Sequence, residues 1–69
     1  MNKQLQKQAE QFVKEICINL WGMSSKEVKN YCIMIINQNM VMAKLNKDYL
    51  ETANVYKKIL NLVQNDKLI

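Results

Sequence analysis

Residues that end helices and turn strands are nearly missing from this sequence. Proline is absent, and Gly22 is the only glycine among 69 residues. β-Sheet proteins use clusters of Gly and Pro to connect their strands, so a sheet is disfavoured. A chain of this length also forms one domain at most. We therefore predict a single all-α domain: a three-helix bundle, or a helical hairpin plus a third helix, with antiparallel neighbours.

Apolar residues recur every three or four positions along three segments, which is the period of a helix with one buried side. The first segment carries Leu5, Ala9, Phe12, Val13, Ile16 and Leu20. The second carries Val28, Cys32, Ile35 and Met42, in a heptad-like spacing completed by Asn39 and Asn46. The third carries Tyr49, Thr52, Ala53, Tyr56, Ile59, Leu60 and Val63. These patterns predict helices over about 2–21, 24–45 and 48–66.

The first corner carries both a helix stop signal and a helix start signal. Gly22 can close the first helix, because glycine readily adopts the left-handed conformation found at helix ends. Ser24 and Glu27 then have the spacing of a capping box. The second helix is therefore expected to start at this serine.

The second corner repeats this chemistry. Asn46 can end the second helix, and Asp48 can cap the third, with Glu51 three residues further on. Neither Asn46 nor Lys47 forbids a helix, so one helix continuing through residue 47 is the alternative. We favour the break.

The second helix is apolar on nearly every side. Four of its large apolar residues lie away from the line of Val28, Cys32 and Ile35: Ile33, Met34, Met40 and Val41. Either the first and third helices straddle the second and cover it, or its second apolar side is an exposed contact surface. We favour the contact surface, because the middle helix of three touches its neighbours over only part of its circumference.

Two residues near the first corner support a contact surface. On an α-helical wheel, Ile18 and Trp21 stand on the polar side of the first helix, and tryptophan is a frequent interface anchor. The alternative for Trp21 is a place over the corner, where it covers the core beside Met23. The expected partner-binding residues are Ile18, Trp21, Ile33 and Met40. The expected assembly is a homodimer through the second helix.

The first corner also resembles the helix-turn-helix family of DNA-binding domains. Residues 14–31 place Gly22 in the turn, Met23 after it and Val28 six residues past the glycine, which is the family's spacing. The resemblance implies a recognition helix whose DNA-contacting residues are Ser25, Lys26, Lys29 and Asn30. The chain departs from the family at Ile18, where a small residue is usual, and in lacking a separate preceding helix. A DNA-binding transcriptional regulator is the alternative function.

Chemical groups needed for catalysis are scarce. The chain has no histidine, the side chain that most often acts as a general acid or base near neutral pH. A single glycine cannot form a phosphate-binding loop, and no Ser or Cys has an evident base. Cys17 and Cys32 fall on apolar helical positions, where we expect them to be buried, and are too few for a disulfide framework or a zinc site. We expect no enzyme activity, no cofactor and no metal.

Charge and hydropathy favour a protein partner. All ten basic residues are lysine, so the net charge of +4 lacks the arginines typical of phosphate and base recognition. The N-terminus has no apolar signal-peptide core, and the longest apolar run, YCIMII, is far shorter than the roughly 20 residues that span a bilayer. We expect a cytoplasmic protein with no membrane partner. Its expected role is that of a small non-catalytic regulator or inhibitor, of viral, phage or AT-rich bacterial origin, that binds another protein through an apolar face.

Overall fold

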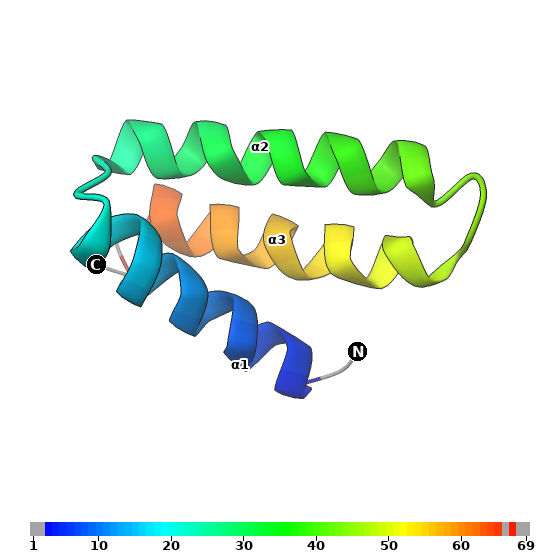
Figure 1. The fold of residues 1–69 in the computed structure, drawn as a ribbon, viewed down its shortest axis with the longest axis horizontal. Helices are drawn as coiled ribbons and strands as arrows, with labels where there is room; N and C mark the ends of the chain where they lie inside the picture. Colours follow the sequence, from blue (N-terminus) through cyan, green and yellow to red (C-terminus); the bar gives the residue numbers. More distant parts are fainter. Residues whose placement is uncertain (1–2, 66, 68–69) are drawn as a thin grey trace.

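Three helical segments make up most of the chain (Figure 1). The computed structural model describes residues 3–65 and 67. Within them, α1 spans Lys3–Phe12 and continues as the π-helix η1 over Val13–Leu20, α2 spans Ser25–Met42, and α3 spans Asp48–Gln64. No strand occurs in this part of the chain, so the predicted all-α, three-helix fold is confirmed. The helix ends expected at residues 2 and 66 lie outside the described residues. None of the described helices is both long and apolar enough to cross a bilayer.

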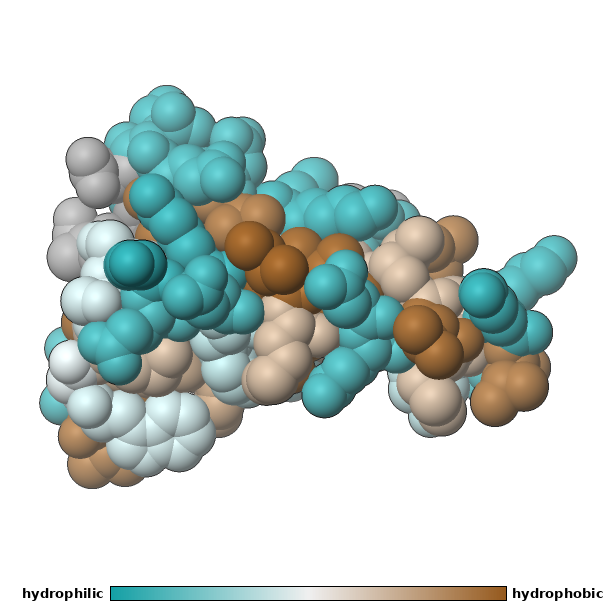
Figure 2. Space-filling view, turned by 90° about the horizontal axis from the view of Figure 1, so that it is seen from above, coloured by the Kyte–Doolittle hydropathy of each residue, from teal (hydrophilic) through white to brown (hydrophobic). Residues whose placement is uncertain are grey.

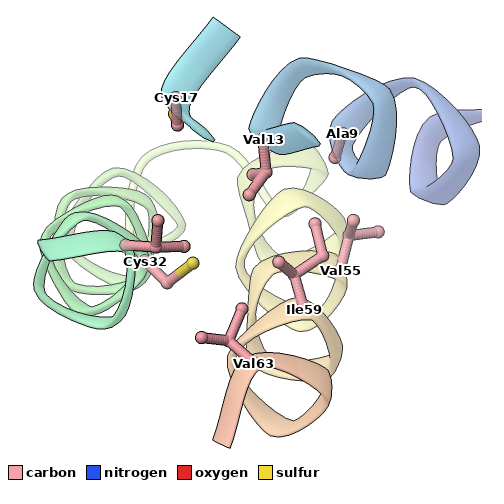
Figure 3. Close-up of a cluster of buried hydrophobic side chains, with 8 residues drawn as sticks. Ala9, Val13, Cys17, Cys32, Val55, Ile59 and Val63 are labelled. Atoms are coloured by element: carbon pink, nitrogen blue, oxygen red, sulfur yellow. The ribbon is translucent and has the colours of Figure 1, made fainter. Parts of the chain in front are cut away.

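The central helix is α3. It lies between α2 and α1 (Figure 1). α1 packs mainly on α3, and its last residue, Phe12, contacts Tyr31 of α2. In Figure 3, Val55 lies on the side of α3 toward Ala9 of α1, whereas Val63 points toward α2. The sequence pattern instead put the second helix in the middle and left Val55 out of the third helix's apolar set. Both expectations are wrong, because they assume one buried stripe on the third helix, whereas α3 is buried on two sides.

The first helical segment changes its winding at Val13. Over Val13–Leu20 the backbone forms a π-helix, in which N–H groups donate to carbonyls five residues back instead of four. The Trp21 N–H continues this pattern to the Ile16 carbonyl at 2.8 Å. A step of four residues overshoots one α turn and falls short of one π turn. The change of winding therefore keeps three buried residues in line over the core: Ala9, Val13 and Cys17 (Figure 3).

The wider turn also moves two residues from their expected positions. Leu20, expected on the buried stripe, is largely exposed. Ile18, expected on the polar side, is half-buried and packs against the core. Both placements are wrong because they assume α winding. Each residue of a π turn advances by a smaller angle, and the difference accumulates along the eight residues of η1.

Gly22 and Ser24 build the first corner. Gly22 has a φ of 64°, in the left-handed region, and its N–H donates to the Ile18 carbonyl at 3.1 Å. The Glu27 N–H donates to Ser24 Oγ at 3.3 Å, and the Ser24 N–H donates to Glu27 Oε1 at 3.1 Å. The predicted capping box is confirmed, and it satisfies backbone N–H groups at the start of α2.

The second corner is capped by a residue other than the expected one. Because α2 ends at Met42 and α3 begins at Asp48, the continuous helix is excluded. The Asp48 N–H donates to Asn46 Oδ1 at 3.0 Å, and the Tyr49 N–H donates to the Asn46 carbonyl at 3.2 Å. The predicted cap at Asp48 is wrong, since the chain begins to turn two residues earlier and Asn46 takes this role.

Candidate protein-binding surface

Large apolar side chains occupy the outer face of α2, the side directed away from α3. On the inner side, Val28 and Cys32 are fully buried in the core. On the outer side the exposed fractions are 44% for Ile33, 46% for Met34, 40% for Met40 and 62% for Val41. Seen from the side of α2, brown and tan surface extends along the molecule between teal patches (Figure 2). The interpretation in which the other two helices cover the second helix is therefore wrong.

One line of side chains runs down the middle of this outer face. Its members are spaced four, three, four, three and four residues apart and are all exposed: Lys26, Asn30, Ile33, Asn37, Met40 and Lys44. We call this line the outer seam; its last member lies in the turn that follows α2. The inner side of α2, from Val28 to Asn39, repeats the same spacing where it packs on α3. The outer seam thus has the periodicity of a helix–helix contact, but none of the described helices lies against it.

Charge is confined to the two ends of the outer face. Residues 30–43 contain no charged side chain, and lysines stand before and after them: Lys26, Lys29, Lys44 and Lys47. Glu27 is the only carboxylate between residues 16 and 47. Hydrogen bonds from Ser24, first from its backbone N–H and then from its side chain, lower the pKa of the Glu27 carboxyl. This carboxylate therefore stays ionised in the helix cap, and the four lysines outnumber it, so the net charge of the face is positive.

Trp21 belongs to a separate aromatic cluster at the first corner. Its ring meets the Phe12 ring edge-on, with centroids 6.1 Å apart and planes at 88°. Phe12 also contacts Tyr31, at 6.1 Å between ring centroids. Trp21 nevertheless remains exposed over more than half of its surface. The cluster covers one end of the core and leaves an indole surface accessible.

The four expected partner-binding residues are thus separated in the structure. Ile33 and Met40 share the outer seam. Trp21 is exposed at the first corner, in the aromatic cluster. Ile18 packs against the core, so most of its side chain is turned away from solvent.

A further apolar group at the second corner is missed by the sequence pattern. Its exposed members are Met42, Leu45, Tyr49 and Leu50, and the expected places of Met42 and Tyr49 on buried stripes are wrong. The pattern extends the second helix to residue 45, whereas the chain already turns over residues 43–47. A usable signal is the concentration of large apolar residues on both sides of the corner at Asn46, because a turn leaves few neighbours to cover them.

Titratable groups of the core are held neutral. Burial raises the pKa of the Cys32 thiol to about 11, with a smaller effect from Cys17, and raises the pKa of the Tyr56 hydroxyl to about 12. The thiolate is the reactive form of cysteine, so these free, buried thiols are poor nucleophiles and metal ligands at neutral pH. Among the described residues, no three His, Cys, Asp or Glu side chains gather as a metal site would need. The outer face itself offers apolar contact and lysine charge.

The residues implied by the helix-turn-helix resemblance begin α2. Lys26 and Asn30 are exposed on the outer seam, whereas Ser25 and Lys29 are half-buried. The exposed side chain of Ile33 continues the line of Lys26 and Asn30. A DNA-reading helix presents mostly polar side chains to phosphates and base edges, so this apolar continuation suits a protein surface better.

Comparison of the chain with protein families, with curated proteins and with solved structures found no match. Its function is therefore inferred from the geometry and charge of the outer face.

Proposed function

We propose that this chain is a small non-catalytic interaction protein that regulates or inhibits another protein by binding it through the outer face of α2. One observation carries the proposal: Ile33, Met34, Met40 and Val41 are exposed on the same helix, on the side that α1 and α3 leave uncovered. A contiguous exposed apolar surface on a small protein generally marks an interface. Two of these residues are methionines, whose flexible side chains adapt to different partner surfaces.

The size of the face favours a reversible contact. α2 has 18 residues, which makes its outer face about 27 Å long and about 10 Å wide. Stable protein interfaces bury about 800 Å² on each partner, more than one helix face of this size provides. Reversible binding of this kind suits a regulator.

A second copy of the chain is the simplest partner to test, because two-fold dimers are the commonest assemblies. In such a homodimer, two α2 helices would pair through their outer faces. Sedimentation velocity at micromolar concentration separates a 69-residue monomer from its dimer. A monomer leaves the outer face free for a different protein.

The substitution Ile33→Glu tests the outer face. A carboxylate forced into an apolar interface loses hydration that the partner does not replace, whereas the same group on the free monomer stays hydrated. We expect the Ile33→Glu chain, used as bait in cell extract, to capture about tenfold less of the partners that the parent chain captures. Far-UV circular dichroism and urea unfolding should remain close to those of the parent.

Leu50→Glu is the matched control. Leu50 is 41% exposed, close to the 44% of Ile33, but it lies on α3. The Leu50→Glu chain should capture the same proteins as the parent. Equal losses for both variants, or no loss for Ile33→Glu, would contradict the proposal.

A DNA-binding regulator is the second candidate, favoured by the exposure of Lys26 and Asn30 in the first two turns of α2. Lysine–phosphate contacts give a binding constant that falls steeply with salt. Titration of duplex DNA into the parent chain at low salt tests this function. Tight, salt-sensitive binding that Ile33→Glu leaves unchanged would support the DNA-binding alternative over our proposal.

A further inference from the structure

The outer seam has the spacing of a helix–helix contact, and its residue types follow a specific order. It reads lysine, asparagine, isoleucine, asparagine, methionine, lysine from residue 26 to residue 44. Its middle is apolar and amide-bearing, and its two ends are cationic. A partner surface that matches it needs an apolar middle and anionic groups at both ends.

We infer that the partner presents an amphipathic helix, with an apolar stripe and carboxylates near both ends, which lies along the outer seam. This inference rests on the proposed function and names the class of its partner. A helix fits because the seam already has the heptad-like spacing with which α2 receives α3 on its other side. The amide side chains of Asn30 and Asn37 interrupt the apolar positions, as polar residues do where they select one register between paired helices.

The positions of the lysines set the length of the partner helix. Lys26 is in the first turn of α2 and Lys44 lies two residues past its end, so the two lysines stand near the two ends of its 18 residues. These residues span about 27 Å along the helix axis. A partner helix of about 18 residues, with carboxylates in its first and last turns, places opposite charges beside both lysines. Such end charges fix register and accelerate encounter, and this contribution weakens as salt rises.

A second copy of the chain fits this charge order poorly. If two outer faces pair in opposite directions, Lys26 of one chain approaches Lys44 of the other, and if they pair in the same direction each lysine approaches its own copy. Either arrangement brings like charges together at both ends of the contact, and like charges disfavour pairing. The single carboxylate of Glu27, which accepts the Ser24 N–H in the helix cap, is outnumbered by Lys26 and Lys29, so this end of the contact keeps a net positive charge. A foreign acidic helix avoids this repulsion.

Two synthetic peptides test the inference directly. Both are 18-residue helix formers with the same leucine and alanine stripe and glutamine elsewhere. One has glutamate in its first and last turns, and the other has lysine at those positions. Each is titrated into the full-length, ¹⁵N-labelled protein at low salt. We expect the glutamate peptide to shift the amide signals of residues 30–44 and to bind at least about tenfold more tightly than the lysine peptide, with affinity falling as salt rises.

Charge-reversal variants locate the contact. Lys26→Glu combined with Lys44→Glu reverses both ends of the outer seam, and both side chains are exposed, so folding should be retained. Lys57→Glu combined with Lys58→Glu makes the same change in net charge on exposed positions of α3. We expect the first pair to weaken binding of the glutamate peptide by about tenfold, and the second pair by no more than about twofold. Circular dichroism of each variant checks its fold.

The remaining outcomes separate this inference from the proposed function. Equal binding of both peptides along residues 30–44 would overturn the acidic helix and leave the apolar contact surface standing. No shifts in α2 with either peptide, together with a dimer in sedimentation that Ile33→Glu dissociates, would assign the face to a second copy. Shifts of residues 30–44 by duplex DNA at affinities above that of the glutamate peptide would overturn both proposals.

Discussion

For a single residue, Cys32, burial in the core changes the acidity of the side chain. The side chain is fully buried, and this burial, with a smaller effect from the nearby Cys17, raises the pKa of its thiol. The expected burial of both cysteines is confirmed. It could be predicted because a cysteine at an apolar helical position behaves as a small hydrophobic residue. The helical spacing of apolar positions can be recognised from neighbouring residues in the sequence alone.

The buried thiol gives the fold a weakness at high pH. An exposed cysteine ionises near pH 9.0, whereas burial keeps the Cys32 thiol protonated until about 11. Between these values only the unfolded chain releases the proton, so the free energy of unfolding falls as pH rises. We expect a loss of up to about 1.4 kcal/mol per pH unit from this group. Urea unfolding from pH 7 to 11 should show a shallower decline for Cys32→Ala than for the parent above pH 9, and parallel behaviour below it. Identical slopes above pH 9 would contradict this assignment.

Elements were predictable where their signals are local. The capping box needs only Ser24 and Glu27 at the right spacing, and it forms as expected. The π-helical winding of η1 has no such local signature. It accompanies the burial of Val13 and Cys17 in the core, where η1 packs on α2. Because winding decides which side a residue faces, this one unforeseen change accounts for the misplaced Ile18 and Leu20.

At the second corner, we predict that the Asn46 side chain stabilises the start of α3. Its Oδ1 accepts the Asp48 N–H at 3.0 Å, so Asn46→Ala removes a cap from α3. We expect a loss of about 1 kcal/mol in the free energy of unfolding, similar to the loss for Ser24→Ala at the first corner. Lys47→Ala is the control, since the Lys47 side chain makes no cap bond, and it should change stability by less than about 0.5 kcal/mol. A larger cost for Lys47→Ala than for Asn46→Ala, in urea unfolding, would rule out the cap.

For the whole molecule, the sequence supplied the number of helices and the excess of apolar surface on the second one, but not its neighbours. Periodicity reports how wide a helix's apolar side is, and it does not say which helix covers that side. The helix shared by α1 and α2 is α3, because α1 packs along α3 and meets α2 through its last residue, Phe12 (Figure 1). The second apolar side of α2 is thereby left to solvent, and its two expected contact residues, Ile33 and Met40, lie there together.

This arrangement predicts opposite behaviour for two valines. Val55 is fully buried on α3, whereas Val41 is 62% exposed on the outer face of α2. Val55→Ala leaves a cavity between α3 and α1 and should cost about 2 kcal/mol, a large part of the roughly 3 to 5 kcal/mol that a core of this size supplies. Val41→Ala should cost less than about 0.5 kcal/mol in dilute protein. Urea unfolding of both variants, followed by circular dichroism at low micromolar concentration, compares the same Val→Ala substitution at a buried and at an exposed position. If Val41→Ala proves as costly as Val55→Ala, the outer face of α2 is covered in solution, and a cost that grows with protein concentration identifies the cover as a second copy of the chain.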